Sequence, residues 1–333
     1  MTVAQYSRYG RLSAAALVLL CWADGESMAA PLDALATDGL YTWRVTSTED
    51  APPWCCVCRD NSPVATACNL DSRHASYSVS DEFQAPKGEM QIYALIEAGK
   101  ARRIRALSPL CKVTTRRDVV DLGLIEVDES LAWLEGHVAT RGPIGTDALA
   151  AIAVHKGSAA LRFLIDTADA GPTKDLRKEA IFWMSQARIG ESAGELERLM
   201  FRDGSAEIRG HAAFSLSQSM AANRSDALIR QGREDHDPEV RSQAWFWLAQ
   251  TGASQSEEAI QWAAANDPDD NVRKEAVFAM SQLPGERGVD GLFAVLGNRQ
   301  AHHEVREQAL FWLAQSDSDR AYEYFDRLLA GRQ

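Results

Sequence analysis

The chain has 333 residues, an ordinary hydrophobic content of 46% and a formal net charge of −12. This length allows two domains or one long array of repeats. The acidic residues are spread along the whole chain, and such a surface repels phosphate backbones, so we expect no nucleic acid partner and no adhesion to an anionic membrane surface.

The N-terminus has the pattern of a secretory signal peptide. Two arginines precede an apolar run, Leu12–Trp22, which is too short to span a bilayer, and Ala23 provides a small residue for cleavage. We expect residues 1–23 to be removed, with a second candidate cleavage after Ala30, and the mature protein to be exported, either periplasmic or secreted. The alternative is a buried N-terminal helix. No other apolar stretch has spanning length, so we expect no membrane-spanning segment.

Residues 31–130 are rich in β-formers and turn residues and predict a small β-rich domain. Gly39–Thr46 has the alternation of a strand. Met90–Ile96 and Ala101–Leu107 flank Gly99, which predicts a hairpin with glycine at its turn. Shorter candidate strands are Ala75–Val79 and Val119–Val127.

Five cysteines remain once the signal is removed, and they all lie in this β-rich region. Export would place them in an oxidising compartment, where disulfides are expected. We expect a local bond between Cys58 and Cys68, and a bond from Cys111 to Cys55 or Cys56. The odd number leaves one cysteine free, paired between chains or modified. The disulfide candidates are Cys55, Cys56, Cys58, Cys68 and Cys111.

The same region suggests two alternative roles for its side chains. Trp54–Cys58 contains the Trp-Cys-x-x-Cys string of thioredoxin-like proteins, but that motif needs a following helix to activate the first thiol. Pro63 makes a helix improbable, so we prefer structural disulfides to redox catalysis or zinc binding as the role of these cysteines. A basic cluster forms either a solvated strand face or a dock for an acidic partner, the solenoid predicted below included. Its members are Lys100, Arg102, Arg103, Arg105, Lys112, Arg116 and Arg117.

A connecting helix and its break, residues 131–144, lead into a repeated pattern. Five copies of one short pattern follow, 32 or 33 residues apart, and such a period is typical of a stacked-repeat solenoid. A degenerate copy around Ala148 precedes them. We therefore predict an all-α solenoid of about six helix pairs over residues 145–330. Its invariant residues are Arg177, Arg209, Arg241, Arg273 and Arg306, then Phe182, Phe214, Phe246, Phe278 and Phe311, then Gln186, Gln218, Gln250, Gln282 and Gln315.

The strings Asp237–Ala244 and Asp267–Ala276 resemble HEAT repeats, most closely the short bacterial kind also found in phycobilisome lyases. The resemblance covers residues 145–330 and does not extend to the N-terminal domain. It implies a scaffold of paired helices that binds other proteins. In such repeats the Arg commonly reaches an acid one repeat away; the candidates are Asp235, Asp237, Asp267 and Asp269.

The remaining invariant residues have two interpretations each. On a helical wheel, Phe and Gln lie on nearly the opposite face from the core stripe. We favour a Phe/Gln ladder that packs one first helix on the next, with the glutamines bonding neighbouring backbone, over a repeated recognition stripe. Trp183, Trp247 and Trp312 recur in alternate repeats, either as core or as partner-facing residues.

No nucleophile, phosphate loop or cofactor motif stands out, so we expect no enzyme and no cofactor. The preferred hypothesis is a non-enzymatic adaptor of the bacterial envelope that binds another protein through the solenoid, on a concave face made by the second helices. One alternative is an enzyme or accessory protein that uses the HEAT scaffold around a metal or prosthetic group, because His303-Glu304 resembles the His-Glu pairs of iron hydroxylases of this fold. The other alternative is the cysteine-based redox protein.

Overall fold

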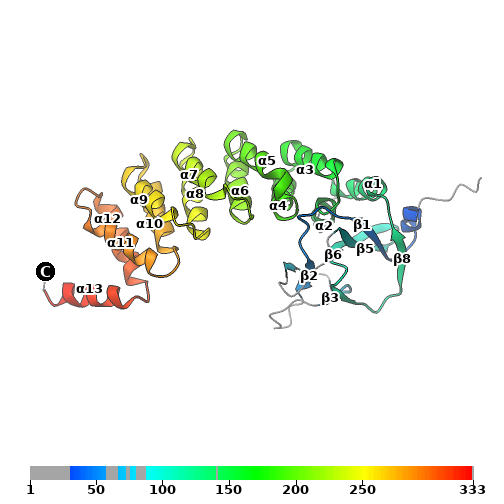
Figure 1. Ribbon diagram of the computed structural model, residues 1–333, viewed down its shortest axis with the longest axis horizontal. Helices are drawn as coiled ribbons and strands as arrows, with labels where there is room; N and C mark the ends of the chain where they lie inside the picture. Colours follow the sequence, from blue (N-terminus) through cyan, green and yellow to red (C-terminus); the bar gives the residue numbers. More distant parts are fainter. Residues whose placement is uncertain (1–30, 58–66, 73–75, 80–87, 140–141, 332–333) are drawn as a thin grey trace, which may run out of the picture.

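The computed structural model describes residues 31–57, 67–72, 76–79, 88–139 and 142–331. The expected signal peptide and Cys58 lie outside these residues. The molecule is a curved row of helix pairs with a small β-domain at one end and helix α13 at the other (Figure 1). None of the described helices combines the length and the apolar character that crossing a membrane requires.

The β-domain is built on a four-stranded sheet in the order β6-β5-β1-β8. Strand β1 pairs antiparallel with β5 and parallel with β8. The predicted hairpin joins β5 to β6, and both turn residues, Ala98 and Gly99, have positive φ. The elements are η1 (Pro31–Ala36), β1 (Gly39–Thr46), β5 (Glu89–Glu97), β6 (Lys100–Leu107) and β8 (Val119–Leu124).

Two small two-stranded sheets complete the β-domain. β2 (Trp54–Val57) pairs with β4 (Ser76–Val79), and β3 (Ala67–Asn69) pairs with β7 (Lys112–Thr114). The buried Cys55 is bonded to Cys111, one of the two pairings expected for Cys111. Cys68 is also disulfide-bonded. Cys55 therefore lies in a strand and not at the start of a helix, where a thioredoxin-like thiol would need to be.

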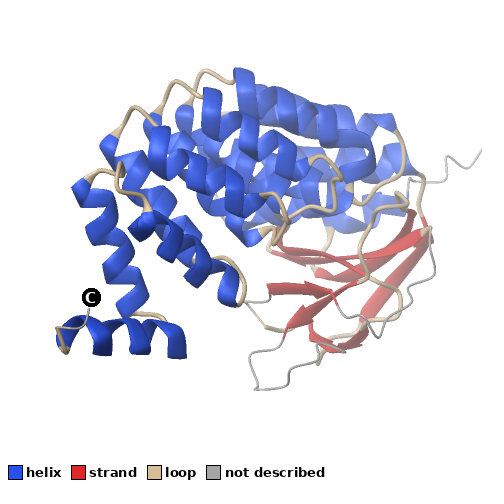
Figure 2. Ribbon diagram, turned by 60° about the vertical axis from the view of Figure 1, so that its left-hand side comes forward, coloured by secondary structure: helices blue, strands red, loops and turns tan. Residues whose placement is uncertain are grey.

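The sheet packs against the first two helices, α1 (Val127–Val138) and α2 (Pro143–Ala153), as Figure 2 shows. The predicted break falls between them, where Gly142 has φ 98° and Pro143 begins α2. Proline suits that first helical position because its missing N–H would have no partner there.

A buried network fastens the β-domain to the first repeat. The Trp43 indole donates to Ser130 Oγ at 2.9 Å, and Ser130 Oγ lies 2.8 Å from His155 Nε2. His155 Nδ1 lies 2.7 Å from the Ala151 carbonyl oxygen, and burial lowers the pKa of His155 to about 4. The imidazole is therefore neutral, donating from Nδ1 and accepting at Nε2. The buried Arg188 donates to the His155 carbonyl oxygen and to the Glu191 carboxylate, so its guanidinium adds further hydrogen bonds to the joint at this point.

Six helix pairs follow in the described part of the chain, as the repeat count predicted. The helices are α2, α3 (Ser158–Ala170), α4 (Lys174–Ala187), α5 (Ile189–Arg202), α6 (Ala206–Ser217), α7 (Arg224–Glu234), α8 (Pro238–Gln250), α9 (Ser256–Asn266), α10 (Asp270–Ser281), α11 (Glu286–Gly297), α12 (His303–Ala314) and α13 (Asp319–Leu329). Gly252, with φ 66°, directly follows the C-cap of α8, and Gly285, with φ 61°, is the N-cap residue of α11.

The even-numbered first helices form the concave side of the solenoid. From α2 to α12 each even-numbered helix packs along the next, whereas neighbouring odd-numbered helices approach each other only loosely. A row of helix pairs that lie closer together on one side than on the other must curve toward that side. In Figure 1 the two ends of the row bend toward the side of the even-numbered helices. Our expectation that the second helices make the concave face is therefore wrong. Small alanines such as Ala180 and Ala244 permit the close approach.

The repeated arginines form a ladder of ion pairs between neighbouring repeats. Arg209 and Arg241 donate two hydrogen bonds each, at 2.8–2.9 Å, to Asp235 and Asp267, which lie 26 residues further on. Arg177 donates one hydrogen bond to Asp203, also 26 residues further on, and a second to the Ala168 carbonyl oxygen. Arg273 pairs instead with Asp270 of its own helix, because the position 26 residues ahead holds Arg299.

Helix α10 begins differently from the prediction. In the sequence, Asp237-Pro238 and Asp267-Pro268 each predict the cap and first turn of the helix that follows them. Instead, Asp269 accepts the hydrogen bonds of the first turn, from the Asn271 and Val272 amides, and α10 starts at Asp270. The Asp267 carboxylate is buried and forms the ion pair with Arg241, so it does not cap α10. Asp237 caps α8 as predicted, accepting from the Glu239 amide.

Candidate functional site

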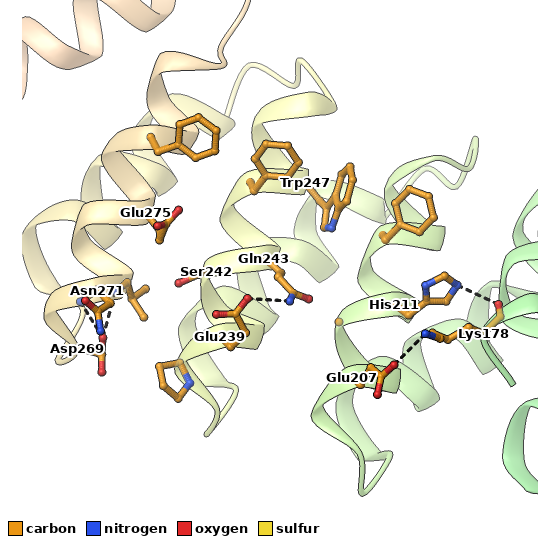
Figure 3. A pocket seen from close by; sticks show the side chains of 16 residues that line it. Lys178, Glu207, His211, Glu239, Ser242, Gln243, Trp247, Asp269, Asn271 and Glu275 are labelled. Atoms are coloured by element: carbon orange, nitrogen blue, oxygen red, sulfur yellow. Dashed lines mark hydrogen bonds and ion pairs between the residues drawn. The ribbon is translucent and has the colours of Figure 1, made fainter. Parts of the chain in front are cut away.

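The concave side contains an open groove of about 1010 Å³ that runs across helices α4, α6, α8 and α10. Figure 3 shows its side chains projecting from these successive first helices. Polar residues stand on one side, toward the helix N-termini, and aromatic rings stand toward the other. The groove is therefore made by the same helices that carry the invariant pattern.

The aromatic side of the groove is a continuous ladder of rings. Phe182 stacks on Phe214 at 6.2 Å between ring centroids, and Phe246 stacks on Phe278 at 5.8 Å. Between these two stacked pairs, the Trp247 ring lies 4.8 Å from both Phe214 and Phe246. The predicted phenylalanine ladder therefore exists, and tryptophan completes it.

The alternation of the tryptophans follows from this geometry. Where a repeat carries Ser215 or Ala279 after its phenylalanine, two phenylalanines stack directly. Where it carries tryptophan, the indole stands between them, as Trp312 does at 4.9 Å from Phe278 and 5.0 Å from Phe311.

The three tryptophans thus serve mainly the packing between repeats. Trp183 is buried and contacts Trp54 of the β-domain, so it faces the interior and not a partner. Trp247 and Trp312 are half-buried, and Trp247 lines the groove. Of the three, Trp247 is the one that a ligand in this groove would touch.

The glutamines do not bond neighbouring backbone as we expected. The amide nitrogens of Gln186, Gln218 and Gln282 each donate at 3.1–3.2 Å to the hydroxyl of the preceding serine in the same chain segment. Gln250 and Gln315 are exposed. The reason is position, since each of these three glutamines stands at the cap or the penultimate residue of its helix, beside a serine of the same turn.

The polar side of the groove carries unneutralised negative charge. Glu239, Asp269 and Glu275 line it, and none of them has an ion pair among the described residues. Glu207 differs, because Lys174 and Lys178 donate hydrogen bonds at 2.8 Å to its two carboxylate oxygens and hold its pKa at about 2. Lys178, the lysine in the groove lining, is thus already engaged.

His211 contributes no positive charge to offset these acids. Burial lowers the pKa of His211, and its Nε2 lies 2.9 Å from the Lys178 carbonyl oxygen. Gln243 stands at the same repeat position one helix on, donating to Glu239 at 3.0 Å. The groove therefore joins an aromatic wall to a rim that is negatively charged at neutral pH.

This rim was not found from the sequence. His211, Gln243 and Glu275 occupy one register, 32 residues apart, but they differ in type, whereas the sequence prediction rests on residues that stay the same. A polar residue at a fixed repeat offset, whatever its identity, was the signal that could have located this surface.

The other sequence candidates lie away from the groove. His303 is exposed, and its Nδ1 lies 3.5 Å from Glu307. Within the described ranges, no group of three or more His, Cys, Asp or Glu side chains could hold a metal ion. Part of the basic cluster is used internally, because Arg103 and Arg105 of β6 donate to the carbonyl oxygens of Leu70 and Ser72.

Comparison with known proteins agrees with this architecture. Residues 225–314 match the family model for HEAT repeats, so the chain is a HEAT-repeat protein in its helical part. The N-terminal domain lies outside the matched residues. None of the curated proteins matches the sequence.

Two solved structures resemble parts of the molecule. Human deoxyhypusine hydroxylase in complex with glycerol matches with a TM-score of 0.31 and 14% identity, over 59% of this chain and 75% of its own. The Escherichia coli protein YibA matches with a TM-score of 0.36 and 17% identity, over 60% of this chain and 81% of its own. Neither similarity bears on the activity of this protein.

Proposed function

We propose that this protein is a non-enzymatic adaptor of the bacterial cell envelope that binds a protein segment carrying basic side chains in the concave groove. The observation that carries the proposal is the groove itself, where an aromatic wall stands beside the free carboxylates of Glu239 and Glu275. HEAT repeats are scaffolds commonly used for protein interaction.

The chemistry of the groove selects the ligand. A lysine or arginine side chain can lay its apolar stem on the rings of Phe246 and Trp247 while its charge lies near a carboxylate. Acidic segments and nucleic acids would be repelled by the same rim. Export, which the N-terminal segment suggests, would place this binding outside the cytoplasm, where disulfides such as Cys55–Cys111 persist.

The test is site-specific photo-crosslinking in the exported full-length chain. A photoreactive amino acid replaces Ser242 in the groove and, in a second variant, Glu258 on the outer helix α9. We expect the Ser242 variant alone to capture a partner, through a peptide that contains lysine or arginine.

Charge reversal supplies the matched control. Glu239→Lys with Glu275→Lys should weaken partner binding at least about tenfold and reduce its salt dependence. Glu234→Lys with Glu258→Lys changes the net charge equally on the outer helices and should leave binding intact. Equal loss in both double variants, or capture from Glu258 alone, would rule out the groove as the binding site.

A further inference from the structure

The last helix pair exposes a surface that the following repeat covers everywhere else. Leu329 of α13 is 85% exposed. The equivalent residues in the earlier second helices, 32 or 33 positions apart, are Met200, Gly232, Ala264 and Leu296. Three of these are buried and Leu296 is half-buried. Leu329 therefore occupies a repeat-to-repeat contact position whose covering element is absent from the described residues.

The covering element in the earlier repeats is the first helix of the next pair. A Cβ atom placed on Gly232 of α7 would lie 2.5 Å from the Trp245 ring of α8, which shows how closely that next helix packs. Leu328 repeats the pattern, since it is 52% exposed while its equivalents Leu199 and Ala263 are fully buried. The apolar face of α13 thus continues past the part that α12 covers.

The aromatic ladder is open at the same end. Phe311 is 52% exposed, whereas the phenylalanines before it are half-buried between rings. It contacts Trp312 of its own repeat at 5.0 Å, and no described ring lies on its other side. Figures 1 and 2 both place α13 at the free end of the row.

The arginine ladder is open there too. Arg306 is exposed and makes no ion pair with any described residue, while Arg209 and Arg241 each hold an aspartate that stands just before the next first helix. The position 26 residues after Arg306 holds Arg332, which cannot serve as that acid. Arg306, Phe311, Leu328 and Leu329 together form what we call the terminal face.

We propose that the terminal face binds an amphipathic helix of a partner protein, seated where the first helix of a seventh repeat would lie. The packing of α10 on α8 is the template, with Phe278 stacked on Phe246 and Asp267 bonded to Arg241. The partner helix presents an aromatic residue to Phe311, an aliphatic stripe to Leu328 and Leu329, and a carboxylate before its first turn to Arg306. This site is separate from the groove and does not depend on the function proposed for it.

The chain's own repeat supplies a probe. A labelled synthetic peptide with the sequence of residues 266–282 carries Asp267, the whole of α10 and Phe278. Its binding to the full chain is measured by fluorescence anisotropy up to about 1 mM, and its helix content by circular dichroism, because a free peptide of this length is only partly helical. We expect saturable binding with a gain of helix.

Variants of the protein locate the binding. Leu329→Asp and Phe311→Ala, both at exposed positions, should weaken binding at least about tenfold. Met220→Asp is the matched control, because Met220 is also 85% exposed but lies in the turn before α7. Glu239→Lys should have no effect, which separates this site from the groove. Arg306→Gln should weaken the binding of the wild-type peptide. It should leave the binding of a peptide that carries Asp267→Asn unchanged.

Three outcomes would overturn the proposal. They are the absence of binding at about 1 mM, an equal loss with Met220→Asp, and a loss with Glu239→Lys alone. Sedimentation of the chain by itself provides a further check. If it is a dimer that Leu329→Asp dissociates, the occupant of the terminal face is a second copy and not a partner helix.

Discussion

Trp54 of strand β2 packs against Trp183 of helix α4, with ring centroids 5.1 Å apart and the planes at 64°. Trp183 in turn contacts Phe182, the first ring of the ladder that continues to Phe311. The β-domain therefore covers the end of the aromatic ladder that would otherwise be open. This arrangement gives a residue of the β-domain a direct effect on the helices.

We predict that Trp54→Ala lowers the stability of the helical part as well as the β-domain. Removal of a buried tryptophan costs about 3–5 kcal/mol, whereas Phe311→Ala at the open end should cost under about 1 kcal/mol. The measurement is chemical denaturation followed by circular dichroism at the helix band. A Trp54→Ala variant whose helical transition stays in place would contradict the capping role.

Arg241→Ala should be far more damaging than Arg306→Ala, although both residues belong to the same invariant set. Arg241 and Asp267 are 10% and 2% exposed in their side chains, so removing the arginine leaves a buried carboxylate without its partner, a loss of about 3–5 kcal/mol. Arg306 is exposed, and its loss should change stability by less than about 0.5 kcal/mol. Thermal unfolding of the two variants checks this ranking, and similar melting temperatures would refute it.

Two glycines in second helices should respond to alanine with opposite signs. Gly232→Ala should destabilise by about 1–3 kcal/mol, because the Trp245 ring leaves no room for a methyl group. Gly194→Ala should stabilise by about 0.5–1 kcal/mol, because nothing lies near its Cβ position and alanine favours a helix. Urea denaturation of both variants decides the matter. The close packing would be disproved if Gly232→Ala were as stable as the wild type.

The Cys55–Cys111 bond should stabilise the β-domain without being required by the solenoid. It closes a loop of 56 residues, for which the chain-entropy argument gives about 4 kcal/mol. A Cys55→Ala, Cys111→Ala variant should therefore show faster hydrogen exchange in strands β1, β5 and β6. Exchange in helices α6 to α10 is the internal control and should not change.

His155 predicts a loss of stability on acidification. Burial lowers its folded-state pKa to about 4 from the usual 6.5, so the unfolded chain binds more protons between these two values. The free energy of unfolding that depends on the neutral His155 is fully present above pH 6.5. It decreases as the pH falls from about 6.5 to about 4, by up to about 3 kcal/mol. Unfolding of the wild type and His155→Gln should diverge least at pH 4. A difference between them that stays constant from pH 7 to pH 4 would contradict a buried neutral imidazole.

The wild type must be compared with the His155→Gln variant because Asp147 changes the stability with pH in the opposite direction. Burial raises the pKa of Asp147 to about 6, so its ionisation destabilises the fold as the pH rises from about 4 to 6. The wild-type profile alone therefore mixes two slopes, and subtraction of the His155→Gln profile isolates the histidine.

The period of the repeat was sufficient to predict six helix pairs and the ring ladder, because each of these repeats a contact between identical neighbours. The Arg–Asp pairs were expected from the resemblance to HEAT repeats. The direction of curvature was not predictable in the same way. It depends on how closely Ala180, Ala244 and similar residues let one row of helices approach, compared with the bulk of the other row. The groove was not predicted for a related reason, since its polar lining residues His211, Gln243 and Glu275 vary in type at one repeat position, while the phenylalanines of its aromatic wall do not.

The β-domain shows the opposite balance. Strands β1, β5 and β6 follow from alternation and from the turn at Gly99. The pairing of β8 with β1 joins segments far apart in the chain, and no local pattern reports it. The contact of Trp54 with Trp183 likewise depends on how the two parts meet.

Because the ring ladder and the ion pairs link only adjacent repeats, the solenoid can gain a repeat without any new kind of contact between repeats. A tandem duplication of residues 235–266 would place a second Asp235 ahead of a second Arg241, and each copy would find the neighbour that the original has. The groove would lengthen by one helix, while Trp54 at one end and Leu329 at the other would keep their surroundings. Gain or loss of repeats could thus change the distance between the two ends of this protein while the residues exposed at each end stay the same.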